Sequence, residues 1–386
     1  MSDGFLKDLR PRPPRGSYDA ALGALRASTR TRIAQIDSGV ARHPNLGFLG
    51  EEIDGAPANI QIDDGINFYD PEIDPRPVSP LRRAPDPLAP FIEYPDHGVK
   101  TLSVILGETS ELVGVAPGAR VVPYRIANGP LFRDTGGPFL GGRAATAALG
   151  QAIEAAIALN PPARVISISM GNPGAVGVFE WIRQLLGGSI GLDRATARAV
   201  DRAYEAGIII VCAAGQVIDR VVYPAAYSRT IAVGGFDRRG ALFEHYPPDG
   251  YAHPDKVDIW AQAQRINRAS YLLEANPPSP IHADDPRNTE AEPSGTSYAA
   301  PQVAAAAALW TERHFDRLEQ LFTAERWKIV ESFRRALRES AAQEQASLRG
   351  NRTTQIRALD IPALLGKAPP EVTGGPADRA TGQGLF

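Results

Sequence analysis

Hydrophobic and polar residues form a repeating block pattern through the middle of the chain. Five short segments are almost continuously apolar and predict buried strands; they are residues 31–40, 120–125, 164–171, 208–214 and 230–235. Two longer segments carry apolar residues at helical spacing and predict helices; they are residues 142–159 and 193–206. This alternation predicts an α/β fold of three layers, in which helices cover both faces of a mostly parallel central sheet.

Residues 51–96 interrupt this pattern. The segment has eleven acidic residues, three basic residues and nine prolines, which disfavour a regular helix or a central strand. It therefore predicts an acidic, Pro-rich insertion at the surface. The carboxylates of Asp63 and Asp64 would suit calcium, but their spacing fits no defined calcium loop, so a solvated acidic surface is favoured.

The predicted organisation is one large domain, residues 29–366, after an N-terminal extension of residues 1–28. Residues 312–366 are expected to form C-terminal helices and a closing element, with an amphipathic stripe in residues 315–337. Residues 367–386 are rich in Pro and Gly, which predicts a flexible or docking tail.

The composition is that of an ordinary globular protein, with 43% hydrophobic and 22% charged residues among 386. A formal net charge of −3 gives no reason to expect nucleic acid or an anionic membrane as a partner. The single cysteine, Cys212, excludes a disulfide within the chain and is predicted to be a buried thiol. No signal-peptide core or membrane-spanning segment is recognisable, which predicts a cytoplasmic protein.

Ser297 is the first candidate for chemistry. It lies just before the Ala-rich residues 299–310, so its hydroxyl is expected at the N-terminus of a helix. Backbone N–H groups at such a place favour an anion, and a nucleophile there can use its own N–H to stabilise the oxyanion that its attack creates. The alternative is that Ser297 only caps the helix.

Two further segments supply an acid and an imidazole that could act together with Ser297. Asp37 ends the first predicted strand, and His97, followed by Gly98, opens an apolar run of helical character. In these motifs the chain resembles the subtilisin-like serine peptidases, whose triad follows the order Asp, His, Ser. The resemblance covers about residues 31–310 and, more loosely, extends to residue 365.

The resemblance implies a role for each of these residues. Ser297 would attack a peptide carbonyl, His97 would accept and later return the proton, and Asp37 would stay ionised and orient the imidazole. His43, which follows Asp37 closely, is expected to be structural.

The resemblance also implies a cleft for the peptide substrate. The expected substrate-binding residues are Ser169, Met170, Gly171, Asn172, Ala213, Ala214 and Gly215. The small residues of the second wall would leave room for a sizeable side chain, whereas Asn172 could narrow the entrance.

The oxyanion hole is the one place where the chain departs from the family pattern. The family has an Asn whose amide completes the hole, together with the N–H of the nucleophile, here Ser297; this chain has Gln216. Three interpretations stay open: Gln216 supplies the amide in a repositioned hole, the hole is weak, or catalysis is lost.

The implied function is that of a serine endopeptidase acting on protein or peptide substrates, with no metal or cofactor expected. Only 36 residues precede Asp37, too few for a folding propeptide domain, so restricted substrates or a regulatory protein partner are expected. The alternative is an inactive relative that acts as a binding or scaffold module, because Gln216 breaks the catalytic set.

Overall fold

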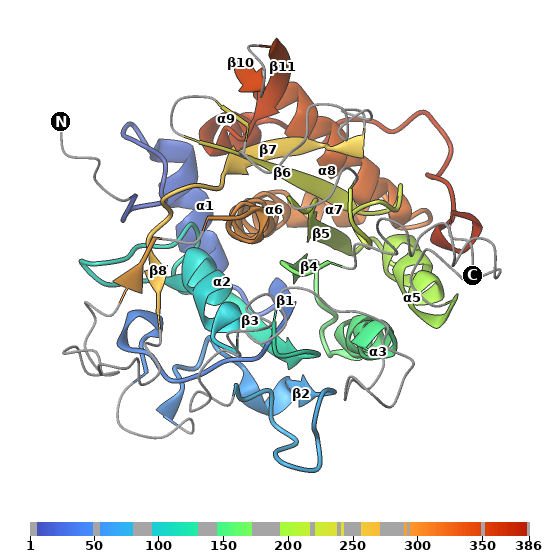
Figure 1. Cartoon of the computed structure of the whole chain (residues 1–386). Coiled ribbons are helices and arrows are strands. Elements are labelled where there is room, and N and C mark those ends of the chain that lie inside the picture. The colour runs from blue at the N-terminus through green and yellow to red at the C-terminus, as the bar shows by residue number, and fades with distance from the viewer. Residues whose placement is uncertain are drawn as a thin grey trace.

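The computed structural model describes most of the chain (Figure 1). The described residues are 6–48, 55–79, 95–129, 145–171, 194–216, 221–237, 241–242, 256–270, 289–291, 294–348 and 352–383. The strands in these ranges are β1 (Arg32–Asp37), β2 (Ile66–Asn67), β3 (Arg120–Arg125), β4 (Val165–Ile168), β5 (Ile209–Ala213), β6 (Ile231–Phe236), β7 (Ile259–Gln262), β8 (Arg268–Ala269), β9 (Thr289–Glu290), β10 (Ala342–Leu348) and β11 (Arg352–Ala358).

Nine of these strands form one large sheet in the order β10-β11-β7-β6-β5-β4-β1-β3-β2. Neighbouring strands are parallel except for the β10–β11 hairpin at one edge. In the middle of the sheet, Ile33 of β1 pairs with Val121 on one side and Val165 on the other. Strands β4 and β5 are buried along their whole length, which explains their almost continuous apolar sequences.

Helices cover both faces of the sheet. They are α1 (Gly16–Ala27), α2 (His97–Leu106), α3 (Ala145–Ala158), α5 (Arg194–Glu205), α6 (Ala300–Arg313), α7 (Phe315–Leu321), α8 (Trp327–Ser340) and α9 (Ile361–Gly366). One hydrophobic core joins the sheet to α1, α2, α6, α8 and α9, and a second joins the opposite face to α3 and α5 (Figure 1). The predicted α/β fold with a mostly parallel sheet and helices around it is confirmed.

The predicted elements correspond closely to those of the structure. The five predicted strands are β1, β3, β4, β5 and β6, and the two predicted helices are α3 and α5. Residues 315–337 form two helices, α7 and α8, and the predicted closing element contains β11 and α9.

Helix α1 lies in the predicted N-terminal extension, yet it belongs to the core. It packs against α6, and its residues Tyr18 and Leu25 are buried. The Tyr18 hydroxyl donates a hydrogen bond of 2.7 Å to the carbonyl oxygen of Val115, so its burial leaves the hydroxyl paired. The folded domain therefore begins before residue 29, the predicted boundary.

The prediction of a flexible tail is wrong for residues 367–383, which pack on the domain. Ala380 is fully buried, and its N–H donates to Asp201 of α5 at 2.7 Å. Near the end of the segment, the side-chain oxygen of Gln383 accepts from the N–H of Ser228 at 2.8 Å. Polar contacts with α5 hold this segment, which is why its low apolar content gave no sign of order.

Replacing Asp201 by alanine is expected to lower the free energy of unfolding by about 3 kcal/mol, because it removes one partner of a buried ion pair. Arg229 contacts Asp201 at 3.0 Å, and the two side chains are only 3% and 10% exposed. The same change releases the backbone and hydroxyl of Thr381, which both donate to Asp201. Urea unfolding measures the loss.

The matched control is Glu205→Ala. Glu205 contacts the same guanidinium at 3.2 Å, but its side chain is 52% exposed. An exposed pair contributes little, so a loss of less than about 1 kcal/mol is expected. Equal losses for the two variants would contradict the assigned importance of Asp201.

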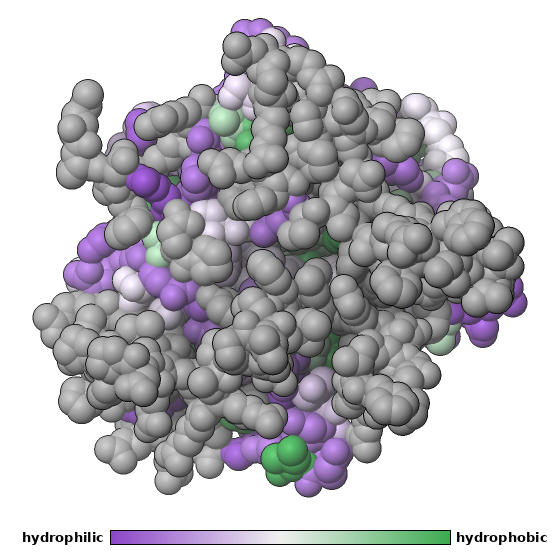
Figure 2. Space-filling model, viewed as in Figure 1, coloured by the Kyte–Doolittle hydropathy of each residue, from purple (hydrophilic) through white to green (hydrophobic). Residues whose placement is uncertain are grey.

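The surface that Figure 2 shows is mostly hydrophilic where residues are described, with green atoms confined to small areas. Ile66 and Ile73 are the exposed large hydrophobic residues of the described chain. Within the described ranges, no helix combines the length and the apolar character that crossing a bilayer requires.

Candidate active site

The end of β1 and the start of α2 bring Asp37 and His97 together. Asp37 is the last residue of β1, and His97 is the first residue of α2. The Nδ1 atom of His97 lies 2.7 Å from Oδ1 of Asp37, and the two side chains are 2% and 1% exposed. A contact of this kind fixes the orientation of an imidazole.

Two neighbours hold the Asp37 carboxylate. The backbone N–H of Ser38 donates to Oδ1 at 2.7 Å, and the Thr101 hydroxyl donates to Oδ2 at 3.0 Å. Gln35 supports Thr101 in turn, because its amide donates to Oγ1 at 2.8 Å. The sequence analysis missed Thr101, although its place four residues after His97 puts it on the same helix face.

Two glycines allow α2 to approach the turn after Asp37. A Cβ atom on Gly98 would lie 2.1 Å from the carbonyl oxygen of Gly39, so a larger residue would push the helix away. Gly39 has a φ of 98°, a conformation that residues with side chains rarely adopt. The Gly after His97 is therefore a packing requirement of the Asp37–His97 contact.

The turn that carries Ser297 precedes α6 and contacts α2. Ser297 sits in a short 3-10 helix (Thr296–Tyr298), and the ring centroid of Tyr298 is 6.1 Å from that of His97. The Ser297 hydroxyl donates to the carbonyl oxygen of Ser169 at 2.8 Å, not to His97. The structure thus brings the three predicted segments to the carboxyl edge of the sheet, with the Ser297 hydroxyl turned toward Ser169.

Gln216 packs against the turn that carries Ser297. Its side-chain oxygen accepts from the N–H of Thr296 at 2.8 Å and from the Thr296 hydroxyl at 3.1 Å. Its amide nitrogen donates to the carbonyl oxygen of Ser294 at 3.4 Å. One of its two amide hydrogens is used in the contact with Ser294.

The two predicted walls of the substrate cleft face a common side chain. Cβ atoms on Gly171 and Gly215 would lie 2.3 Å and 2.7 Å from methyl groups of Val222. The side chain of Val222 therefore packs against one glycine of each predicted wall. Ser169 and Met170 are buried, and Asn172 lies outside the described residues.

The structural interpretations of His43 and Cys212 agree with the structure. His43 is buried, and its Nδ1 accepts from the N–H of Asn45 at 3.1 Å at the start of a 3-10 helix. Cys212 is buried in β5, and this burial raises the pKa of its thiol. A thiol in such surroundings is not a nucleophile.

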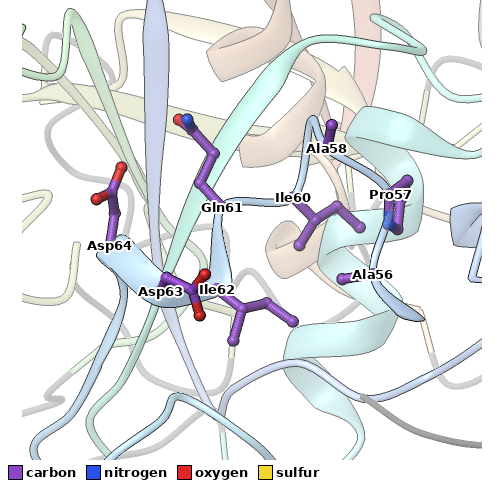
Figure 3. A pocket seen from close by; sticks show the side chains of 8 residues that line it. All are labelled: Ala56, Pro57, Ala58, Ile60, Gln61, Ile62, Asp63 and Asp64. Carbon is purple, nitrogen blue, oxygen red and sulfur yellow. The ribbon is translucent and has the colours of Figure 1, made fainter. Parts of the chain in front are cut away.

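The insertion carries a pocket of about 360 Å³ (Figure 3). Its lining includes Ile60, Gln61, Asp63 and Asp64, and the two carboxylates point in different directions. Asp64 pairs with Arg32 at 2.9 Å. Across the described residues, no group of three or more His, Cys, Asp or Glu side chains is arranged to hold a metal ion.

Comparisons with known proteins point to one family. Residues 28–355 match the family model described as the subtilase family. The thermostable alkaline protease of Halalkalibacterium halodurans is 27% identical over 288 residues, which cover 73% of this chain and 57% of that protein. Subtilisin BL of Lederbergia lenta is 24% identical, with 73% of this chain and 77% of that protein covered. The chain thus matches little more than half the length of the first relative.

Solved structures of low sequence identity share the fold. The prenylagaramide maturation protease PagA aligns with a TM-score of 0.55 at 20% identity, covering 92% of this chain and 98% of that one. A protease of Pseudoalteromonas arctica aligns with a TM-score of 0.59 at 18% identity, covering 91% and 93%. These similarities extend well beyond the segments that carry Asp37, His97 and Ser297.

Proposed function

This chain belongs to the subtilase family, and from that premise we propose that it is a serine endopeptidase whose triad is Asp37, His97 and Ser297. The observation that carries the proposal is the buried 2.7 Å contact between His97 and Asp37 beside the segment of Ser297. An imidazole held in this way by a carboxylate can act as a base toward a neighbouring hydroxyl.

The proposed mechanism assigns one proton path. His97 donates its Nδ1–H to Asp37, so Nε2 accepts the proton of Ser297 as Oγ attacks the peptide carbonyl carbon. The proton then passes to the leaving amine as the C–N bond breaks, and water hydrolyses the acyl-enzyme. Asp37 remains ionised and stabilises the imidazolium.

The attack requires Ser297 to leave the Ser169 carbonyl. A change of its χ1 rotamer would release the hydroxyl from this hydrogen bond. The tetrahedral oxyanion would then accept from the Ser297 N–H and from the second amide hydrogen of Gln216. Gln216 would then have two roles. Its amide nitrogen would donate to the oxyanion, and its oxygen accepts from Thr296 and so anchors the turn that carries Ser297.

Restricted substrate choice is part of the proposal. Val222 lies against both Gly171 and Gly215, which reduces the room between the two walls of the cleft. A small side chain before the scissile bond fits such a cleft better than a large one. A regulatory protein that favours the productive orientation of Ser297 would be a second form of restraint.

A binding or scaffold role is the second candidate. Two hydrogen bonds favour it. The Ser297 hydroxyl donates to Ser169, and the Gln216 oxygen accepts from Thr296, so both proposed catalytic side chains make structural contacts. In that case the cleft would bind a peptide without cleaving it.

Labelling with a fluorophosphonate separates the two candidates, because the probe reacts only with an activated serine. The native chain is expected to become labelled at Ser297 and Ser297→Ala is expected to stay unlabelled. Ser347→Ala, a change at an exposed serine of β10, should label like the native chain. An unlabelled native chain would contradict the peptidase proposal and support the scaffold.

A further inference from the structure

Four charged residues that the proposed mechanism does not use lie next to the active site. Arg268 and Lys100 are 0% and 2% exposed. Arg268 pairs with the carboxylate of Glu290, and Lys100 pairs with those of Asp96 and Glu290. Burying a charge is costly unless it is paired and hydrogen-bonded. The burial of these two cations, one on α2 and one on β8, therefore needs a physical explanation.

One carboxylate joins the two cations. Lys100 Nζ contacts Asp96 at 2.9 Å and Glu290 at 2.6 Å, and Arg268 lies 3.5 Å from the same Glu290 oxygen. Asp96 immediately precedes His97, and Lys100 lies one helical turn after it. The four charges sum to zero, and they connect the start of α2 to strands β8 and β9.

Arg268 also contacts the residue that follows the nucleophile. Its guanidinium carbon lies 3.7 Å from the ring centroid of Tyr298, a close cation–π contact. The backbone carbonyls of Ile266 and Ala291 accept hydrogen bonds of 3.1 Å and 3.3 Å from Nη1 and fix the plane of the guanidinium. The ring of Tyr298 also neighbours His97. Tyr298 therefore lies next to His97 in space and next to Ser297 in the chain.

A backbone contact strengthens the same connection. The N–H of Ala269 in β8 donates to the Ser103 hydroxyl of α2 at 3.0 Å. The antiparallel pair β8–β9 is thus attached to α2 at two points, through Ser103 and through Lys100. It reaches the Ser297 turn at a third point, through Arg268.

We propose that Arg268 is a positioning residue for the reaction. Held by Glu290 and stacked on Tyr298, it fixes the turn that carries Ser297 relative to the helix that carries His97. This inference rests on the proposed peptidase function and adds to it a group that touches neither substrate nor reacting atoms. Misplacing a catalytic group by about 1 Å can cost about 10²-fold in rate.

The experiment compares Arg268→Met with a matched buried arginine remote from the site, Arg229→Met. Arg229 is also buried, paired with Asp201 and stacked over the ring of Tyr204 at 4.7 Å. It precedes β6, at the sheet edge opposite the carboxyl ends of the strands. Both variants are expected to lose thermal stability.

The rate of fluorophosphonate labelling is the readout that a merely structural role would not move. Arg268→Met should label at least about tenfold more slowly than the parent, and Arg229→Met within about twofold of it. With a peptide substrate, the loss in Arg268→Met should fall on kcat, with KM little changed. Arg268→Met leaves Lys100 paired with Glu290, so no cation is left alone.

A second variant covers the case in which Arg268→Met fails to fold. Tyr298→Leu removes the stacked ring and keeps the ion pair, and it should slow labelling to a similar degree. Labelling of folded Arg268→Met or Tyr298→Leu at the parental rate would overturn the positioning role alone. A parent that is not labelled at all would overturn both this role and the peptidase function on which it rests.

Discussion

Replacing His97 by alanine is expected to lower kcat by about 10⁶-fold, the size of loss known for this kind of substitution in a subtilisin, a relative of this chain. Without the imidazole, no group accepts the proton of Ser297 or returns it to the leaving amine. Asp37 keeps its hydrogen bonds from Ser38 and Thr101, so the site should stay folded. Turnover of a peptide substrate, with circular dichroism for the fold, measures the effect.

Thr101→Val serves as the comparison for His97→Ala. It removes a single hydrogen bond from the Asp37 carboxylate and leaves the contact with His97 in place. A hydrogen bond to a charged group contributes about 1.5–3 kcal/mol. The loss in kcat should therefore be no more than about tenfold to 100-fold. A His97→Ala protein that keeps more than a hundredth of the parental kcat would rule out the proton path assigned to His97.

Gln216→Glu should reduce kcat by about 10²–10³-fold, the range found when one such donor is removed from a subtilisin. Glutamate has the same length, so one carboxylate oxygen can still accept from the N–H and hydroxyl of Thr296. It has no amide hydrogen, however, and it places a negative charge beside the oxyanion. Single-turnover kinetics would detect the slower acylation. The unfolding free energy should also fall, because the amide that donates to the Ser294 carbonyl becomes a carboxylate oxygen that the carbonyl oxygen repels.

Gln216→Asn tests the opposite half of the same side chain. Asparagine keeps an amide donor but is one methylene shorter, so the contact with Thr296 should be lost. We expect a lower melting temperature, because two neutral hydrogen bonds with Thr296 are lost at a cost of about 1 kcal/mol each. The kcat should stay within about tenfold of the parent, because an amide donor is kept. Parental kcat in Gln216→Glu together with a large loss in Gln216→Asn would identify Gln216 as an anchor only.

The strands, and the positions of Asp37, His97 and Ser297 at the ends of elements, could be predicted because local patterns indicate them. Segments such as 164–171 and 208–214 are apolar throughout, as strands buried on both faces must be. Asp37, His97 and Ser297 each stand where a strand ends or a helix starts, and a glycine lies within two residues of each. The Asp37–His97 contact follows from that placement.

The remaining features depend on contacts that no local pattern encodes. Strands β8 and β9 have two residues each, too few for a periodic signal, so Arg268 and Glu290 gave no sign of their proximity to Lys100. The orientation of Ser297 is set by a carbonyl 128 residues away. The direction of the Gln216 amide depends on the turn of Thr296, and that turn forms only in the folded protein.

The position of helix α6 late in the chain determines when the active site can form during synthesis. It is buried from Ala300 to Glu312 and contacts α1, α2, β4 and β5. The ribosome therefore synthesises Asp37 and His97 long before α6, which packs against α2. Most of the chain must be translated before Ser297 can reach them. Pairings between such distant segments slow folding, so the nascent chain should be inert toward its neighbours for most of its synthesis.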